Sequence, residues 1–368
     1  MSKFTLFLIH GIGVHRDAGW ADETINLLEQ AWNESVEMGI EKNAFRDHIE
    51  VVPITYDAVF EDYLDDFADL GKAVFHDAID LDDDERQRLS DTLQAHEVTD
   101  RHFVWSYLVD VILYKMSLVR EQINALVAKQ IYTCISAGST ADNFGIIAHS
   151  LGTRVINDTL QRIRTEQADR SNFYQQGYKL KFLMQISDVT DLFGLPFNKD
   201  KFPPKNVFPR DAYDYFRTVT NCFDPIARII PTRLNHWPSG REAERYMGRE
   251  IYKDILLDHV HETNVHGLTH YMLHPEITDE IFDLCGFGRF LTERESRRLA
   301  FPTVGPKVNS GLRGALHTLM ADAAVLADNS WQTYVNLVLK FADFSIEHNE
   351  PGHFDHHDRP GSQGEVIA

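Results

Sequence analysis

The sequence predicts an α/β fold in which a mostly parallel sheet is flanked by helices. Two features predict it: short apolar runs that suit strands buried on both faces, and amphipathic segments between them that suit crossover helices. Phe4 to Ile9 is an apolar run, Trp20 to about Met38 has apolar residues at helical spacing, and a second strand is predicted over Ile49 to Tyr56. Strand, helix and strand in this order open a parallel sheet.

The length and composition fit one core that carries an insertion. The chain has 368 residues, of which 43% are hydrophobic and 25% charged, as in a protein with a large buried interior. We expect the core to comprise residues 1–57 and 140–348. Residues 58–139 have only helical periodicity and are rich in aromatic side chains, which suits either a helical cap over the core or ordinary helical packing. Residues 349–368, rich in Gly, Pro, His and Asp, are expected to be disordered.

After the insertion, the alternation of strands and helices resumes. A strand from Phe144 to Ala148 leads through Ser150 into a helix from Leu151 to about Arg164. Phe193 to Arg210, rich in Pro, Lys and Asn, is expected to be a long loop. The remaining predictions are strands over Leu180 to Ile186, Tyr215 to Thr220 and Ile255 to His261, and helices around Glu276 to Leu284 and from Leu312 to about Phe344.

The charge and the cysteines limit the possible partners and the compartment. Lys and Arg total 36 against 56 Asp and Glu, a net charge of −20 that repels phosphate backbones and anionic membranes, so no nucleic-acid partner is expected. Cys134, Cys222 and Cys285 form neither a disulfide framework nor a zinc pattern, which favours a cytoplasmic protein without a metal site or other cofactor. The apolar stretch from Phe103 to Leu118 is shorter than the roughly 20 residues of a membrane span, so no stable membrane insertion is expected. The oligomeric state is left open.

The segment most informative about chemistry is Ala-His-Ser-Leu-Gly at residues 148–152. A strand that turns directly into a helix at Ser150 strains the backbone there and exposes the side chain. Ala148 and Gly152 are small enough for neighbouring backbones to approach the turn. A helix N-terminus also favours a developing negative charge, whereas the simpler alternative is a serine that only caps the helix.

This segment resembles the nucleophile elbow of α/β-hydrolases, with Ala148 where the consensus has Gly, and His10-Gly11 resembles the oxyanion-loop motif of the same superfamily. The resemblance implies a lipase-like or esterase-like serine hydrolase. The sequence departs from the family in one respect: with Phe4 to Ile9 as the first strand, its sheet is expected to lack the family's two N-terminal, antiparallel strands. The resemblance implies that Ser150 is the nucleophile and that the backbone N–H groups of Ile12 and Leu151 bind the oxyanion. It also implies that four residues support the site or the substrate: His10, Gly11, Gly13 and His149.

The acid of a catalytic triad is expected at Asp224. The superfamily's chain order is serine, acid, histidine, and its acid follows a strand. Asp224 comes just after the strand predicted over Tyr215 to Thr220 and immediately before a proline. Asp188 and Asp191, which come after the preceding strand, are the alternatives.

The base is expected in the loop from Asn264 to Tyr271, between the last strand and the helix near Glu276. Two histidines lie in this loop; His266, followed by a flexible glycine, is the first choice and His270 the second. His259 and His261 are expected within or at the end of the last strand, where they reach the elbow poorly.

The predicted function is hydrolysis of a carboxylic ester through an acyl-enzyme on Ser150. An aromatic-rich cap favours a small-molecule ester with an apolar moiety, although amides and thioesters use the same elbow. The first alternative is a binding or scaffold protein that has the fold without the chemistry. The second is a metal-dependent hydrolase, suggested by 18 histidines including those of the tail, although the His-Glu-x-x-His signature is missing.

Overall fold

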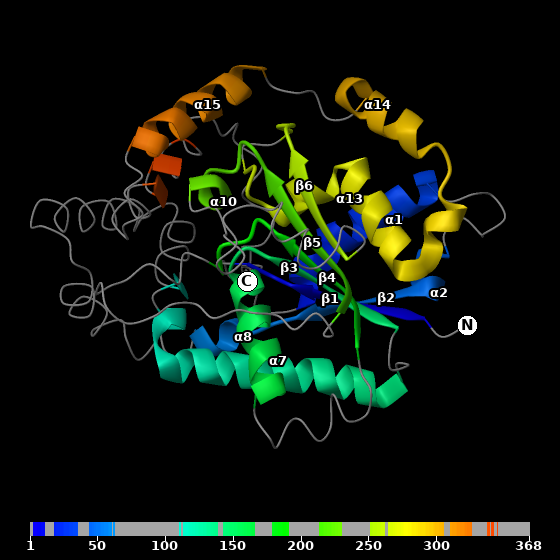
Figure 1. Cartoon of the computed structure of the whole chain (residues 1–368), viewed down its shortest axis with the longest axis vertical. Helices are drawn as coiled ribbons and strands as arrows, with labels where there is room; N and C mark the ends of the chain where they lie inside the picture. The colour runs from blue at the N-terminus through cyan, green and yellow to red at the C-terminus, as the bar shows by residue number, and fades with distance from the viewer. Residues whose placement is uncertain are drawn as a thin grey trace, which may run out of the picture.

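A sheet of six parallel strands forms the centre of the described part of the molecule (Figure 1). The computed structural model describes residues 3–11, 18–35, 44–60, 62, 110–111, 113–138, 143–165, 179–190, 213–229, 251–261, 264–304 and 310–325, and five residues between 337 and 344. Within these ranges the strand order is β2-β1-β3-β4-β5-β6, and every neighbouring pair is parallel. The predicted α/β fold is therefore confirmed. The strands are β1 (Phe4–Ile9), β2 (Ile49–Ile54), β3 (Phe144–His149), β4 (Leu180–Ile186), β5 (Tyr213–Asn221) and β6 (Tyr252–Leu257).

Helices cover both faces of this sheet, as a parallel sheet requires. One face carries α7 (Ser117–Gly138) and α8 (Leu151–Thr165), and the other carries α1 (Asp22–Ser35), α12 (Leu268–Met272) and α13 (Pro275–Phe282) (Figure 1). No helix of the described ranges is both long and apolar enough to cross a membrane. Further helices of the described residues include η1 (Ala18–Ala21), α2 (Phe45–His48), α10 (Pro225–Ile229), η3 (Asp283–Phe287), η4 (Gly288–Phe290), α14 (Arg294–Val304) and α15 (Ser310–Val325).

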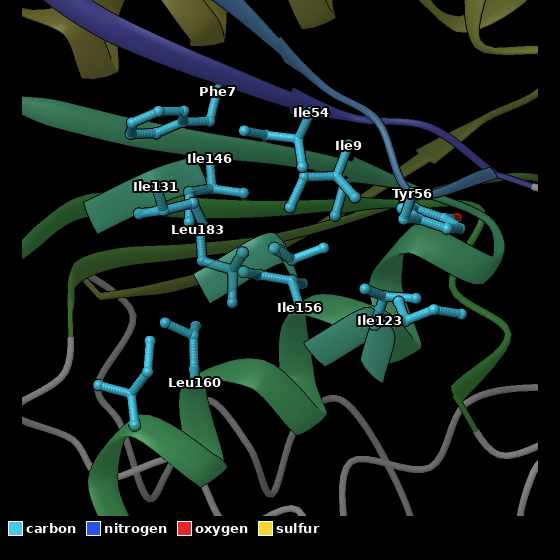
Figure 2. Close-up of a cluster of buried hydrophobic side chains, with 14 of the residues drawn as sticks. Phe7, Ile9, Ile54, Tyr56, Ile123, Ile131, Ile146, Ile156, Leu160 and Leu183 are labelled. Atoms are coloured by element: carbon cyan, nitrogen blue, oxygen red, sulfur yellow. The ribbon is translucent and has the colours of Figure 1, made fainter. Parts of the chain in front are cut away.

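The continuous apolar run of β1 is explained by burial on both faces. Successive strand side chains point to opposite faces, so Phe7 and Ile9 join the core under α7 and α8, whereas Leu6 and Leu8 join the core under α1 and α13. Figure 2 shows Phe7 and Ile9 in the first of these clusters, which also includes Ile156 of α8. Every residue of β1 is buried.

Helix α7 lies within the predicted insertion. Its apolar side chains recur at helical spacing and are buried against the sheet and α8, so this part of the insertion completes the core. The buried residues are Val119, Ile123, Val127, Ile131 and Ile135. Residues 63–109 of the insertion, the loop predicted at 193–210 and the tail at 349–368 lie outside the described residues.

The last strand, predicted over Ile255 to His261, begins and ends earlier than expected. It pairs with β5 from Tyr252, opposite Phe216, to Leu257, opposite the last residue of β5. Because β5 ends there, the chain beyond Leu257 has no strand to pair with. His259 and His261 consequently come after the strand, and their predicted place within it is wrong.

The sheet reverses its direction of growth at β1. The chain passes from β1 to β2 on one side and then returns to place β3 on the other. Ile9 pairs with Ala148, so the residues that leave β1 and β3 emerge side by side at the carboxyl edge. Parallel α/β sheets commonly bind ligands at such a switch point.

Candidate active site

Ser150 occupies a strained turn between β3 and α8. Its φ is 51°, in the left-handed region that non-glycine residues rarely adopt. The Ser150 N–H donates to the carbonyl oxygen of Ile186 at the end of β4 (3.0 Å), and its own carbonyl oxygen accepts from the Thr153 hydroxyl (2.6 Å). These bonds hold the turn in a conformation that would otherwise cost of order 1–3 kcal/mol.

The end of β1 lies directly against this turn. A Cβ added to Gly11 would lie 2.6 Å from Ser150 Cβ, and one added to Gly152 would lie 2.8 Å from the carbonyl oxygen of Ile9. Both approaches are closer than packed carbon atoms allow, so glycine is required at both positions. The small residues predicted around the elbow therefore have a steric reason in the structure.

His266 connects Ser150 to Asp224. Its Nε2 lies 2.8 Å from Ser150 Oγ, and its Nδ1 lies 3.0 and 2.9 Å from Asp224 Oδ1 and Oδ2. A neutral imidazole donates at one nitrogen and accepts at the other. The tautomer that fits both contacts carries its proton on Nδ1, which leaves Nε2 to accept the hydroxyl proton of Ser150. Such an arrangement can activate a hydroxyl as a nucleophile.

Asp224 is fixed as the cap of α10, the helix that comes after β5. Its Oδ1 accepts the backbone N–H groups of Ile226 (3.0 Å) and Ala227 (3.1 Å). Aspartate is favoured at a helix N-cap because its oxygens satisfy the N–H groups of the first turn. The carboxylate is thus oriented by the backbone as well as by His266.

The other carboxylate oxygen of Asp224 accepts two hydroxyl groups. Ser187 Oγ lies 2.5 Å and Tyr271 Oη 2.8 Å from Asp224 Oδ2. Burial would raise the pKa of Asp224, but His266, the Ser187 hydroxyl and the Ala227 N–H outweigh it and lower that pKa to about 2. Asp224 is therefore an ionised carboxylate at neutral pH although it is fully buried.

His149, which precedes Ser150, fixes the backbone of the base. Its Nε2 donates to the carbonyl oxygen of His266 at 2.6 Å, and both rings are buried. The strand that carries the serine is thereby tied to the segment that carries the histidine, 117 residues later.

The His10 side chain contacts residues just after β2. Its ring stacks on Tyr56 with 4.1 Å between centroids, and its Nε2 lies 3.5 Å from Asp57 Oδ1. The Tyr56 hydroxyl donates to the carbonyl oxygens of His10 (2.8 Å) and Gly11 (3.2 Å). These contacts fix the segment that leaves β1.

The two expected oxyanion donors can be placed only in part. Leu151 is the first residue of α8, so its N–H belongs to a helical turn whose N–H groups have no partner within the helix. Ile12 and Gly13 lie outside the described residues.

Searches among known proteins add nothing to this geometry. No protein-family model, curated protein or solved structure matches the chain. The contacts of the site itself are therefore the basis for a functional assignment.

His270, the second choice for the base, is not brought to Ser150. It lies in α12 and not in the loop where it was predicted, because the helix begins at Leu268, two residues after His266. Its Nε2 is 3.2 Å from Asn221 Nδ2 and 3.2 Å from the carbonyl oxygen of His259. Burial lowers the pKa of His270 to about 4, and the neighbouring His261 contributes to the decrease.

Of the two alternative acids, Asp188 and Asp191, the structure describes Asp188. Asp188 accepts the Thr153 hydroxyl (2.7 Å) and the N–H of Thr190 (2.9 Å), so it supports the first turn of α8. Asp191 lies outside the described residues.

Four histidines, His259, His261, His270 and His274, form a cluster, and all but His270 also contact Phe301 of α14. His274 lies at the centre, with its ring centroid 5.3 Å from His261, 5.4 Å from His259 and 5.8 Å from His270. In the described part of the chain, no group of three or more His, Cys, Asp or Glu residues is placed to hold a metal ion. The histidines of the tail lie outside that part.

Three residues at the site were not foreseen: Ser187, Tyr271 and Tyr56. Ser187 comes directly after a buried strand, as Ser150 does, and that position is a signal present in the sequence. The two tyrosines gave no such signal, because a buried aromatic residue usually belongs to the core. Their hydroxyl contacts depend on residues far apart in the chain.

Proposed function

We propose that the protein is a serine hydrolase of the α/β-hydrolase type that cleaves carboxylic esters in a reducing cytoplasm. The observation that carries this proposal is the pair of contacts made by His266, 2.8 Å to Ser150 Oγ on one side and 2.9 Å to Asp224 on the other. The three side chains come from the ends of three different strands or the segments after them. A hydroxyl, an imidazole and a carboxylate in this order form the nucleophile, base and acid of a catalytic triad.

In the proposed reaction, Ser150 Oγ attacks the ester carbonyl carbon while its proton passes to His266 Nε2. The tetrahedral intermediate collapses when the C–O bond to the alcohol breaks, and His266 gives the proton to that leaving oxygen. Water then attacks the acyl-enzyme, His266 takes the water proton, and the Ser150 oxygen regains it as the carboxylic acid leaves. Asp224 stabilises the charged imidazole in both halves of the reaction.

The oxyanion of each intermediate is stabilised, in this proposal, by the N-terminus of α8. The Leu151 N–H lies in the first turn of that helix, next to Ser150. Helix N-termini favour negative charge because their N–H groups are free and the helix dipole is positive there. The N–H of Ile12 is the second proposed donor.

The architecture supports the proposal. The site lies at the carboxyl edge of a parallel sheet, at the point where strand order reverses. The order β2-β1-β3-β4-β5-β6 agrees with an α/β-hydrolase sheet without its first two strands, since no described strand is antiparallel.

Labelling with a fluorophosphonate probe tests the proposal directly. The wild-type chain is expected to become labelled on Ser150, and a Ser150→Ala chain is expected to remain unlabelled and to lose hydrolysis of p-nitrophenyl esters. A Ser150→Ala chain that hydrolyses these esters as fast as wild type would end the proposal.

The ester substrate is proposed to carry an apolar moiety. This rests on the aromatic side chains of the insertion, most of which lie outside the described residues. A series of p-nitrophenyl esters from acetyl to octanoyl tests it; a preference for acetyl contradicts it.

One observation favours a scaffold without catalysis. Ser150 is only 1% exposed and His266 is 0% exposed, whereas a substrate carbonyl must touch Ser150 Oγ. The Ser150 side chain is therefore not exposed as the strand-to-helix turn predicts, and a substrate can reach its Oγ only after a conformational change. A folded chain that no fluorophosphonate labels, at any concentration up to millimolar, supports the scaffold.

A further inference from the structure

The carboxylate of Asp224 receives more hydrogen-bond donors than its contact with His266 requires. Besides His266 and two backbone N–H groups, the hydroxyls of Tyr271 and Ser187 both donate to Oδ2. Both residues are fully buried, so neither hydroxyl can exchange this bond for water. A carboxylate offers about four lone-pair sites, so the two hydroxyls compete with the imidazole for them.

The Tyr271 hydroxyl is held with its hydrogen toward Asp224. Its oxygen accepts the backbone N–H of Asn221, the last residue of β5, at 3.1 Å. Its own proton is then free to point at Asp224 Oδ2. Burial and the nearby Asp224 charge raise the pKa of Tyr271 well above its ordinary range, so the group remains a donor.

Ser187 stands between the acid and the base. Its Oγ lies 2.7 Å from His266 Nδ1 as well as 2.5 Å from Asp224 Oδ2. The Ser187 hydroxyl can accept a hydrogen bond from the Nδ1–H of His266 and donate one to the carboxylate of Asp224. Its φ of 53° places it in a conformation that persists only where the surroundings impose it, and its N–H is fixed by the carbonyl oxygen of Val219 at 2.9 Å.

We propose that Tyr271 and Ser187 are positioning residues that set how strongly Asp224 holds a proton on His266. Each donated hydrogen bond spreads part of the carboxylate charge away from the imidazole. Asp224 then orients His266 without keeping it protonated, and a protonated His266 cannot accept the Ser150 proton. This inference rests on the proposed function, in which His266 is the base.

A purely structural role for Tyr271 predicts a different result. If Tyr271 only joined α12 to β5, its loss would lower the stability and leave the protonation of His266 unchanged. The pH at which His266 titrates therefore separates the two.

The test is Tyr271→Phe, which removes one oxygen atom and retains the ring. The acid limb of kcat/KM is expected to move to higher pH by on the order of one unit, because Asp224 becomes more basic and favours the charged imidazole. Well below the wild-type midpoint kcat/KM is expected to fall about ten-fold, since less of the free enzyme has its base unprotonated, and the loss becomes smaller toward high pH.

Tyr114→Phe is the matched control. Tyr114 is also fully buried and its hydroxyl lies 3.1 Å from an aspartate oxygen, Asp158 Oδ2, and 2.9 Å from Asn124 Oδ1, but it lies on the α7 and α8 face. This variant is expected to lose stability without moving the pH profile.

Ser187→Ala provides a second, independent variant, with Ser35→Ala as its control. Ser35 is equally buried and its hydroxyl donates to a helical carbonyl oxygen, that of Ala31. Ser187→Ala is expected to move the acid limb in the same direction as Tyr271→Phe, because the His266 Nδ1–H then donates to Asp224 alone. If Tyr271→Phe does not fold, Ser187→Ala still tests the proposal.

A second readout does not depend on turnover. The imidazole signals of His266, assigned by NMR through their loss in His266→Gln, are titrated in the wild type and in each variant. An upward shift of the His266 midpoint in Tyr271→Phe or Ser187→Ala is expected. Identical midpoints in the wild type and every folded variant overturn the proposal. If fluorophosphonates and esters fail with the wild type, the proposed function fails, while this titration still tests the hydroxyls.

Discussion

Two serines at the ends of neighbouring strands share one backbone geometry and differ in what surrounds them. Ser150 comes after β3 with φ 51°, and Ser187 comes after β4 with φ 53°. Each N–H donates to a residue of the next strand, Ser150 to Ile186 and Ser187 to Val219. Both hydroxyls contact His266, but at opposite nitrogens, Nε2 and Nδ1.

The difference lies in the segment that each turn leads into. Ser150 leads at once into α8, whose N-terminal N–H groups suit an oxyanion, whereas the two residues directly after Ser187 are not helical and its hydroxyl faces a carboxylate. A sharp turn after a parallel strand is therefore not enough to make a nucleophile. The helix N-terminus and the imidazole nitrogen that the serine meets separate the proposed nucleophile from the positioning residue.

The largest expected effect comes from exchanging each serine for alanine. Ser150→Ala is expected to lower kcat by about 10⁴-fold or more, because no other hydroxyl can form the acyl-enzyme. Ser187→Ala is expected to lower kcat/KM by only about ten-fold, since Asp224 and the backbone still hold His266. Steady-state kinetics with one p-nitrophenyl ester gives both values. Equal losses in the two variants contradict the distinction between the two turns.

The acid offers the next largest effect. Asp224→Asn is expected to lower kcat by about 10³- to 10⁴-fold, since an amide NH₂ cannot accept from Nδ1–H and favours the wrong tautomer of His266. Asp188→Asn is the matched control, because Asp188 comes after the other turn and accepts from the Thr153 hydroxyl. Its kcat is expected to remain within about ten-fold of wild type. If Asp188→Asn lowers kcat as much as Asp224→Asn does, Asp224 is not identified as the acid of the triad.

The segment that brings His266 to both serines also carries two histidines that the proposed mechanism does not use, and they give a pH prediction. Burial lowers the pKa of His270 to about 4 and of His274 to about 2, against 6.5 for an exposed histidine. Above pH 6.5 these groups are neutral in both states. Below pH 6.5 the two histidines bind protons in the unfolded chain but remain neutral in the folded chain. The free energy of unfolding therefore falls as pH decreases toward 4. For His270 alone the full loss is about 3 kcal/mol.

Urea unfolding between pH 7.5 and 4.5 measures this slope. His270→Gln/His274→Gln is expected to flatten it relative to wild type, even if the double variant starts from a lower stability. The lowered pKa of Asp224, about 2, acts mainly below pH 5 and contributes little in this window. Parallel slopes in wild type and variant rule the two histidines out as the cause.

The sequence predicts those parts of the fold and site that depend on local pattern. The apolar run of β1 and the helical spacing of α8 predict their elements closely. Burial on both faces of a sheet produces a continuous apolar run, and burial of one face of a helix produces apolar residues at helical spacing. The turn at Ser150 is marked by small neighbours, and Asp224 by a strand end. In contrast, the convergence of Ser187 and Tyr271 on one carboxylate oxygen depends on the packing of α12 against β5, which no short segment encodes.

The end of β6 shows the same limit in another way. Its residues suit a strand up to His261, and only the length of its partner β5 stops the pairing at Leu257. Likewise, His270 was expected in a loop because the short helix α12 has too few residues to show a helical period. Both errors arise where an element's bounds are set by a partner distant in the chain.

The smallest expected effect separates backbone strain from side-chain function at the two turns. Glycine adopts positive φ without the steric cost that alanine has, so Ser150→Gly is expected to be more stable than Ser150→Ala by about 1 kcal/mol, and Ser187→Gly more stable than Ser187→Ala by a similar amount. Ser35 of α1, whose φ is not positive, supplies the opposite sign: there glycine is expected to be less stable than alanine by about 0.5–1 kcal/mol, because glycine loses more backbone freedom on folding. Thermal unfolding of the six variants in pairs measures all three differences. Because each pair lacks the hydroxyl in both members, the difference reports the backbone alone. A preference for alanine at position 187 together with one for glycine at 150 would mean that only the elbow is strained, and the shared geometry of the two turns would be refuted.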